Sequence, residues 1–173
     1  NCVRKHLSRL KGGRLVRRLG GARLISLILS DVVGDRLDTI ASGLTVPDPT
    51  TFSQALGVVT KYGLEQALPE GVMRLLRAGA AGAVQETPKP GDPVFARVRN
   101  VLLGTNRVAL EAAAGAARTL GYATLVLSSR ITGEAREVAR VYAAVALEAA
   151  SGFGAARPPC CILGGGETTV TIR

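Results

Sequence analysis

Short apolar runs in the second half of the chain alternate with longer segments whose apolar residues recur at helical spacing. The apolar runs lie at 101–103, 123–127 and 160–163, and helices are expected between them at 106–120 and 132–150. Strands that alternate with helices of this length favour right-handed βαβ units on a parallel sheet. The pattern therefore predicts an α/β fold with a parallel or mixed sheet and flanking helices, in a Rossmann-like three-layer arrangement.

The first half of the chain has a less regular pattern. A helix is expected over residues 3–10, a buried strand over 24–29, a helix that begins at Thr50 or Thr51 and ends near residue 62, and a short helix over 69–79. Residues 86–93 contain three prolines and a glycine, which exclude regular structure and predict an extended connector.

The formal net charge of +9 is concentrated at one end of the 173-residue chain. Residues 1–23 carry eight basic side chains and no acidic one, whereas the rest of the chain is close to neutral. A basic segment of this kind can bind phosphate, a carboxylate or a nucleic-acid backbone. Nucleic acid is disfavoured, because aromatic residues make up only 3% of the chain and none lies in residues 3–13 to stack on a base.

Composition excludes several other classes of protein. No run approaches the roughly 20 apolar residues of a membrane span, and the apolar run at 24–29 lacks the cleavage site of an export signal. Three cysteines and one histidine cannot form a four-ligand zinc site at standard spacing. We therefore expect free thiols, a cytoplasmic location and no membrane partner. Because the chain begins with Asn and stops inside a strand-like run, we also expect it to be a piece of a longer protein.

Two carboxylates follow the strand expected at 24–29. Asp31 and Asp35 are separated by a loop that contains Gly34, near the carboxyl edge of the sheet, where sites in parallel sheets lie. Carboxylate oxygens at such a point suit Mg²⁺, and an aspartate there could accept a proton from a substrate hydroxyl. The alternative is that one of them caps the following helix, and the spacing leaves both open.

Two glycine-containing loops are candidates for holding an anion. The segment Gly104-Thr105-Asn106 joins a strand to a helix whose N-terminal amides and dipole favour negative charge, although Asn106 could equally be an ordinary helix cap. The segment Gly164-Gly165-Gly166-Glu167 would let the backbone approach an anion closely. It lacks the Walker A pattern and a β-branched run follows it, so taken alone it indicates a hairpin turn.

The expected helix at 3–10 would gather polar side chains on one side, namely Arg4, Ser8 and Lys11, with Lys5 and Arg9 beside them. Such a face can bind a phosphate or a substrate carboxylate, and the alternative for each of these side chains is solvated surface. His6 alone is weak evidence for a catalytic site, because an isolated histidine usually has a structural role or is exposed to solvent.

Six runs of residues carry a family resemblance across essentially the whole chain. They are VRKHLSRLKGG at 3–13, LILSDVVGDRLDTIASGLTVPDPTTF at 27–52, ETPKPGDPVFARV at 86–98, NRVALEAA at 106–113, LSSRITGEAREVAR at 127–140 and PPCCILGGGETTVTIR at 158–173. In this order they resemble the class II glycerate 2-kinases. Those proteins carry a C-terminal MOFRL domain and have often been labelled hydroxypyruvate reductases.

The resemblance implies ATP-dependent phosphorylation of D-glycerate at its 2-hydroxyl, with Mg²⁺, in a cleft between two α/β domains. It implies that residues 1–85 belong to the N-terminal domain, 86–99 to a proline-rich connector, 100–157 to a βαβα segment and 158–173 to the start of the MOFRL-type domain. The family's Gly-Lys-Ala and Gly-Arg-Asn-Gln-Glu segments are absent here. The chain alone is therefore expected to be inactive.

Phosphoryl transfer asks for a metal, cationic side chains and backbone amides around the phosphates, and three groups of residues are expected to supply them. The catalytic residues would be Asp31, Asp35 and Lys11, and the two aspartates would hold Mg²⁺. The glycerate site would contain Arg4, Lys5, His6, Ser8, Ser42, Gly43 and Thr45. The nucleotide site would contain Thr105, Asn106, Gly165, Gly166, Glu167 and Thr168. ATP and D-glycerate are the expected partners, with no nucleic acid and with a homodimer as one option.

Two positions depart from the family pattern. Leu44 stands where proline is usual, which loosens a loop, and Gly164 stands where serine is usual, which removes a hydroxyl.

Two rival functions make different demands. A nicotinamide-dependent reductase acting on hydroxypyruvate would need a Gly-x-Gly-x-x-Gly turn after a strand, and no such turn is present. A non-enzymatic module that binds nucleic acid through its basic end would show steep salt dependence of DNA binding.

Overall fold

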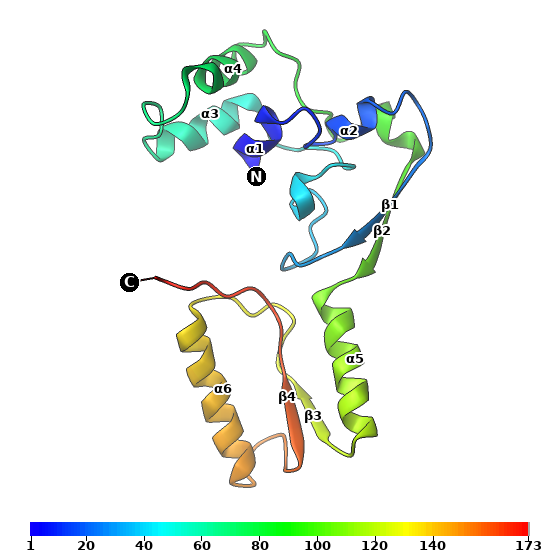
Figure 1. Ribbon diagram of the computed structural model, residues 1–173, viewed down its shortest axis with the longest axis vertical. Helices are drawn as coiled ribbons and strands as arrows, with labels where there is room; N and C mark the ends of the chain where they lie inside the picture. The colour runs from blue at the N-terminus through cyan, green and yellow to red at the C-terminus, as the bar shows by residue number, and fades with distance from the viewer. Residues whose placement is uncertain (173) are drawn as a thin grey trace. The chain divides into compact units, whose positions relative to one another are not determined.

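The computed structural model describes residues 1–172, and the chain divides into two compact units (Figure 1). The first unit comprises Asn1–Ile28 and Arg36–Val101, and the second comprises Leu29–Asp35 together with the chain from Leu102 onward. Neither unit is one continuous stretch, because the loop that follows the first strand belongs to the second unit.

The first unit consists mainly of helices and loops. Its elements are α1 (Cys2–Leu7), α2 (Arg14–Arg17), the 3₁₀ turn η1 (Ile40–Ser42), α3 (Phe52–Lys61), α4 (Glu70–Ala80) and the 3₁₀ turn η2 (Pro93–Arg97). α3 begins as the sequence predicts, with a capping box in which the Thr51 hydroxyl accepts from the Gln54 amide and the Gln54 side chain accepts from the Thr51 amide.

The apolar core of the first unit lies between α3 and α4. It is formed by Phe52, Ala55, Val59, Met73 and Leu76. A Cβ at Gly79 would overlap the Phe52 ring, so the absence of a side chain there lets α4 pack closely on α3. Burial of this apolar surface is the main source of stability for the helix pair.

Strands β1 (Leu24–Leu29) and β2 (Val98–Gly104) pair with each other. Their carboxyl ends lie side by side. The pairing continues past β1, where the Ser30 amide donates to the Gly104 carbonyl oxygen at 2.9 Å. The loop that contains Asp31 and Asp35 therefore starts next to the end of β2.

The rest of the second unit is a βαβ-type segment. It contains α5 (Asn106–Thr119), β3 (Ala123–Val126), α6 (Ala135–Ala150) and β4 (Cys160–Leu163). β3 and β4 are parallel, in a register that pairs Ala123 with Cys160 and Val126 with Leu163. The strand pair lies between α5 and α6 in Figure 1, and α5 buries Leu110, Ala114 and Ala117.

The α/β class is confirmed, with parallel strands and flanking helices. Within residues 1–172 the strands form two two-stranded sheets. Most of the expected helices and strands are present within a few residues of their predicted bounds. No helix in this described part of the chain is both long and apolar enough to cross a membrane.

The expectation of a hairpin turn at residues 164–167 is wrong. This segment stays extended after β4 and continues alongside residues 131–134, with parallel bridges from Ile131 to Gly166 and from Glu134 to Thr169. The Gly165 amide donates to Ser128 O at 2.8 Å, and the Ile131 amide donates to Gly165 O at 3.0 Å. The β-branched run that follows the glycines thus extends the β3–β4 ladder.

The expected helix at 3–10 is also too long, because α1 ends at Leu7. Ser8 is extended, and its hydroxyl accepts hydrogen bonds from the amides of Leu10 and Lys11. This local turn competes with helix extension. Arg4, Ser8 and Lys11 therefore do not share one helical face.

The proline-rich segment lacks helix and strand at 86–92, as predicted, and η2 begins at Pro93. Thr87 and Pro88 are buried in the first unit, and the Asp48 amide donates to Pro88 O at 2.9 Å. The segment is thus a packed part of that unit.

Candidate functional site

The residues predicted for the site fall into two groups, one in each unit. The first unit contains Arg4, Lys5, His6, Ser8, Lys11, Ser42, Gly43 and Thr45. The second unit contains Asp31, Asp35, Thr105, Asn106, Gly165, Gly166, Glu167 and Thr168. The predicted glycerate site and Lys11 therefore belong to the first unit. The predicted nucleotide site and the two aspartates belong to the second unit.

The second unit contains a pocket of about 530 Å³ at the carboxyl ends of β1, β2 and β4. Its lining includes Ser30, Asp31, Thr105, Asn106, Gly165 and Gly166. Three loops that are distant in sequence therefore meet at one place. This is the edge at which open α/β sheets bind their ligands.

Thr105 and Asn106 have different tasks at the start of α5. The Thr105 hydroxyl caps the helix by accepting from the Val108 amide, at 3.3 Å. Asn106 is the first helical residue, and its side-chain amide donates to Ser129 O at 3.1 Å. The alternative of Asn106 as the cap is therefore wrong. The first amides of α5 have no intrahelical partner and lie at the positive end of the helix dipole, which favours an anion.

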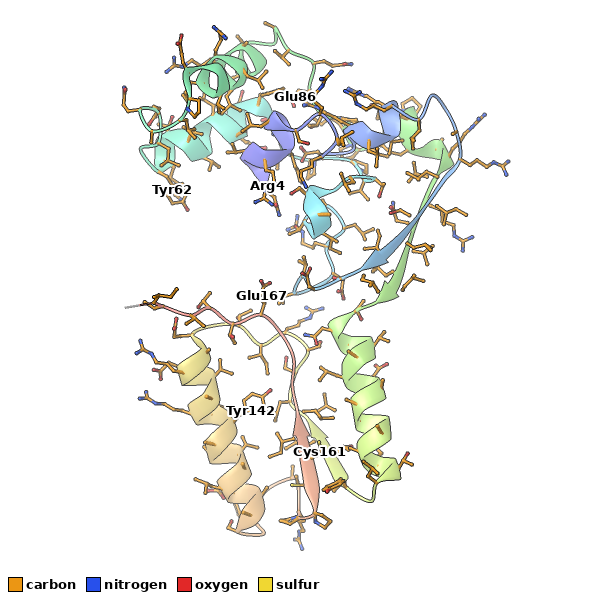
Figure 2. The ribbon with its side chains drawn as sticks, viewed as in Figure 1. Arg4, Tyr62, Glu86, Tyr142, Cys161 and Glu167 are labelled. Atoms are coloured by element: carbon orange, nitrogen blue, oxygen red, sulfur yellow. The ribbon has the colours of Figure 1, made fainter. Side chains whose placement is uncertain are left out.

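The three glycines after β4 each lie where a side chain would overlap a neighbour. A Cβ on Gly164 would overlap the Tyr142 hydroxyl, one on Gly165 would overlap the Asn106 side chain, and one on Gly166 would overlap the Ile131 backbone. Figure 2 shows Tyr142 reaching from α6 toward this part of the chain. The glycines thus allow close packing of the pocket wall, and a tyrosine hydroxyl lies next to the position where the family usually has a serine.

Asp31 is exposed at the pocket, and Asp35 is half-buried in a left-handed turn, with φ of 55°. Neither caps a helix, since the next one, η1, begins after Thr39. Among residues 1–172, neither carboxylate makes a hydrogen bond or an ion pair. The described residues contain no cluster of three or more His, Cys, Asp or Glu side chains. Mg²⁺ usually takes one or two carboxylates together with substrate phosphates and water, so one aspartate beside a phosphate cradle suits it.

Glu167 and Thr168 lie just beyond the pocket wall. Both are exposed, and the Glu167 amide donates to Ile131 O at 2.9 Å. Figure 2 labels Glu167 on the extended chain after β4. Neither side chain lines the pocket. Their assignment to the nucleotide site stays a prediction.

The first unit has a buried polar network around Lys5 and Asp48. The Lys5 ammonium lies 3.1 Å from an Asp48 carboxylate oxygen and 3.7 Å from Asp38. Asp48 is fully buried and also accepts from the hydroxyls of Thr50, at 2.7 Å, and Thr87, at 3.0 Å. A buried charge pair of this kind is costly to break, because removing one partner leaves the other charge unpaired.

His6 continues this network toward Glu86. Its Nε2 lies 3.2 Å from a Glu86 carboxylate oxygen and its Nδ1 lies 2.9 Å from Cys2 O, so both ring nitrogens face oxygen atoms. The ring packs edge-on against Phe52 at 4.6 Å between centroids. Glu86, which Figure 2 labels beside α1, also accepts from Lys89 at 3.1 Å. Lys5 and His6 are therefore engaged with protein partners, and their assignment to the glycerate site stays a prediction.

Two carboxylates of this network have lowered pKa values. Burial raises the pKa of Asp48, but hydrogen bonds from Thr50 and Lys5 outweigh it, so the pKa lies below its ordinary value. Burial likewise raises the pKa of Glu86, and hydrogen bonds from Phe52, Lys89 and His6 more than compensate for it. Both side chains are therefore ionised at neutral pH.

The remaining predicted residues of the first unit lie on two loops that are hydrogen-bonded together. The Gly12 amide donates to Ser42 O at 3.0 Å, and the Gly13 amide donates to Gly43 O at 2.7 Å. The Lys11 ammonium donates to Ala41 O at 3.1 Å. These bonds hold the loop after α1 on the loop that carries Ser42.

The loop around Leu44 is fixed on both sides, although it lacks the usual proline. Gly43 is bonded to Gly13, and the Asn100 side chain donates to Thr45 O at 3.3 Å. Ser42 donates to the Asn1 side chain at 2.9 Å. Of the predicted glycerate-site residues, Arg4 is exposed, whereas Ser42, Gly43 and Thr45 are buried.

Sequence reasoning missed Asp48, Glu86 and Lys89 as members of the buried network. The only signal for them was their place in the runs TVPDPTTF and ETPKPGDP, where charged residues lie between prolines and threonines. Charged residues are almost never fully buried unless they are paired. Their partners lie 43 positions apart for Lys5 and Asp48 and 80 apart for His6 and Glu86, which no local pattern reveals.

The N-terminus of α5 and the Gly165–Gly166 backbone meet at the carboxyl ends of strands, with Asp31 beside them. In α/β proteins this is the kind of place where ligands, and anions in particular, are bound. Residues 1–77 match a domain of unknown function designated DUF4147. The chain is 40% identical to a glycerate 2-kinase of Pyrococcus horikoshii over 173 residues, covering 100% of the chain and 38% of that protein. Over its whole length the chain is therefore similar to a segment of proteins named glycerate kinases.

Two further relatives agree with this placement. A solved glycerate kinase of Thermotoga maritima is 37% identical, with a TM-score of 0.80, over 99% of this chain and 38% of that one. A protein of Agrobacterium vitis, provisionally named hydroxypyruvate reductase, is 45% identical over 99% of this chain and 37% of its own length. The chain thus spans well under half the length of the curated relatives it matches.

Proposed function

We propose that the complete protein containing this chain is a glycerate 2-kinase, which transfers the γ-phosphoryl group of ATP to the 2-hydroxyl of D-glycerate. The observation that carries the proposal is the pocket of the second unit, where Asp31 lies beside the N-terminus of α5 and the Gly165–Gly166 backbone. The name of the Pyrococcus horikoshii relative, a glycerate 2-kinase, supports the same activity.

In this proposal the second unit binds the phosphates of ATP. The first amides of α5 and its dipole would neutralise part of their charge, and Thr105 fixes the start of that helix. The lack of side chains at Gly165 and Gly166 leaves the pocket wall as bare backbone. Glu167 and Thr168 would contact the nucleotide outside the pocket.

Asp31 and Asp35 are the residues that would hold Mg²⁺. The metal, when bound, would neutralise charge on the phosphate oxygens. Asp31 is the better placed of the two, because it lines the pocket. The same carboxylate is also the candidate for accepting the proton of the glycerate hydroxyl as its oxygen bonds to phosphorus and ADP leaves.

The first unit would bind the carboxylate of D-glycerate. Arg4 is exposed, and Lys11 is half-buried beside the loop of Ser42 and Gly43, so these two cations are the candidates for direct contact. Lys5 and His6 would not touch glycerate but would hold α1 in position through their contacts with Asp48 and Glu86. Ser42, Gly43, Thr45 and Ser8 would shape this loop region. A cytoplasmic location and a homodimer are compatible with the proposal and stay predictions.

The test is an assay of the complete protein with Mg-ATP and D-glycerate, in which ADP release is measured and the product is identified as 2- or 3-phosphoglycerate. Glycerate-dependent ADP release with 2-phosphoglycerate as product is expected. ADP release no higher than in the glycerate-free control would overturn the kinase proposal. Oxidation of NADH or NADPH by hydroxypyruvate, run in parallel, would instead support the reductase suggested by the Agrobacterium vitis name.

A further inference from the structure

Four arginines of the basic N-terminal segment gather at one concave surface of the first unit. Arg9, Arg14, Arg17 and Arg18 line a cavity of about 320 Å³ together with Val84 and Gln85. We name these four residues the arginine cluster. None of the residues assigned to the glycerate or nucleotide sites lines this cavity.

Backbone carbonyl groups hold three of these side chains in place. Arg14 donates to Ser8 O at 2.9 Å and to Gln85 O at 3.4 Å. Arg17 donates to Glu86 O at 3.2 Å, and Arg18 donates to Arg9 O at 3.3 Å. Bonds of this kind fix the position of a guanidinium group without neutralising its charge, because a carbonyl group carries no net charge.

The charges of the cluster are only partly compensated by acidic groups. Asp92 pairs with Arg17 at 3.1 Å. Glu86 is near Arg14, but its carboxylate oxygens are already bonded to His6, Lys89 and the Phe52 amide. Burial lowers the pKa of Arg14, as does the charge of Arg17, while Glu86 and Asp48 oppose the shift. The fold therefore holds like charges together at a cost that a bound anion would relieve.

We propose that the arginine cluster is a binding site for a small polyvalent anion of the oligophosphate class, additional to the nucleotide pocket of the second unit. Guanidinium groups bind phosphate oxygens in pairs, and several fixed groups around one concavity match an anion with several such oxygens. A nucleic acid fits less well. The lining contains no aromatic side chain for base stacking.

Arg9 and Arg18 are the positions to change, because they hold the fold least. The Arg9 side chain makes no hydrogen bond among residues 1–172, and that of Arg18 makes one, to Arg9 O. Arg14, in contrast, bridges several carbonyl groups and lies 5.8 Å from the centre of the Phe52 ring. Its replacement would confound binding with folding.

The experiment is calorimetric titration of the complete protein with inorganic tripolyphosphate, at low and at physiological salt. Wild type should show two classes of site. Arg9→Gln/Arg18→Gln should lose one class, with affinity at least roughly tenfold weaker, since charge-assisted contacts are among the strong ones. Arg74→Gln/Arg77→Gln, which removes two exposed arginines of α4, is the matched control and should keep both classes.

A second comparison separates this site from the proposed kinase site. Asn106→Ala should weaken tripolyphosphate binding at the sites that remain in the arginine variant. It should leave binding at the arginine cluster unchanged. If the double variant does not fold, Arg9→Gln alone serves the same comparison. Tripolyphosphate binding in the arginine variant that is unchanged from wild type, in every class of site, would overturn the proposal. A single class in wild type that the arginine variant loses would support the arginine site and count against the proposed kinase pocket instead. Arginine-dependent binding of a short single-stranded oligonucleotide that is tighter than that of tripolyphosphate would also overturn it, in favour of nucleic acid.

Discussion

The Asn106 side chain lies where a side chain on Gly165 would have to go. The same amide group donates to Ser129 O at 3.1 Å. The first residue of α5 is thus held between the extension of β4 and the loop after β3. This contact fixes the start of the helix against the extended segment Gly164–Gly166, and so sets the shape of the pocket.

Gly165→Ala should therefore damage both stability and nucleotide binding. The added methyl group has to displace Asn106, and overpacking of this kind costs about 1–3 kcal/mol. Chemical denaturation of the complete protein measures the loss, and ATP titration measures the change in affinity. Gly115→Ala, inside α5 with open space around it, is the control and should stabilise the helix by about 0.5–1 kcal/mol. If Gly165→Ala matches wild type in both measurements, the contact with Asn106 does not shape the pocket.

The helix pair of the first unit gives a second prediction. Gly79→Ala in α4 should lower the free energy of unfolding by at least about 1–3 kcal/mol, because the new Cβ overlaps the Phe52 ring in the centre of the core. Gly71→Ala in the same helix meets nothing within 4 Å and should be neutral or stabilising. Equal unfolding midpoints for the two variants would contradict this account of the packing.

The carboxylates of Asp48 and Glu86 predict an acid-dependent loss of stability. Asp48 and Glu86 have pKa values below the ordinary 3.8 and 4.5, so in acid the folded state binds fewer protons than the unfolded state. Their stabilisation is fully present above the ordinary values and is lost as the pH falls through the lowered ones. Denaturant midpoints should be constant from neutral pH down to about pH 5 and then fall.

Asp48→Asn tests the origin of that acid dependence. The variant should be less stable at neutral pH, because it leaves the Lys5 ammonium buried beside an uncharged group. Its midpoint should also depend less on pH below about 5, since one of the titrating groups is gone. A pH profile parallel to that of wild type would assign the acid sensitivity to other carboxylates.

Asp31→Ala should abolish most of the kinase activity and leave the fold intact. We expect turnover in the complete protein to fall by at least about a hundredfold, as for the loss of a catalytic acid or base. The exposed position of Asp31 should limit the change in unfolding free energy to about 0.5 kcal/mol. Glu137→Ala, which removes an exposed carboxylate from α6, is the control for general charge effects. Wild-type turnover in Asp31→Ala would remove this residue from the site.

Local signals were enough to predict most of the secondary structure. Thr51 followed by Gln54 produces a capping box at the start of α3, and the apolar run at 24–29 forms the strand β1. The prediction that this strand is buried is wrong, because Ile25, Leu27 and Leu29 are exposed. These features depend on neighbours within a few positions. The sequence also led to the loops after β1, β2 and β4, and the structure brings residues of all three to one pocket.

The errors came from interactions between distant residues. Gly164 to Gly166 have the composition of a turn, yet they remain extended because residues 128–133 supply hydrogen-bond partners. Lys5 and His6 have the pattern of a solvated basic segment, yet they are buried because Asp48 and Glu86 pair with them. Neither partner is visible in a short window of sequence.

The loop at residues 29–35 has a consequence for any dissection of the protein into separately expressed pieces. It belongs to the second unit, although the chain on both sides of it belongs to the first. A shortened chain that begins at Leu102 would contain α5, α6 and Gly164–Gly166 but would lack Asp31. Protease cleavage at Leu102 would likewise leave residues 29–35 on the fragment that contains the first unit. A minimal piece that keeps the whole pocket therefore has to be made by grafting residues 29–35 onto the later segment, for instance by circular permutation, and not by simple truncation.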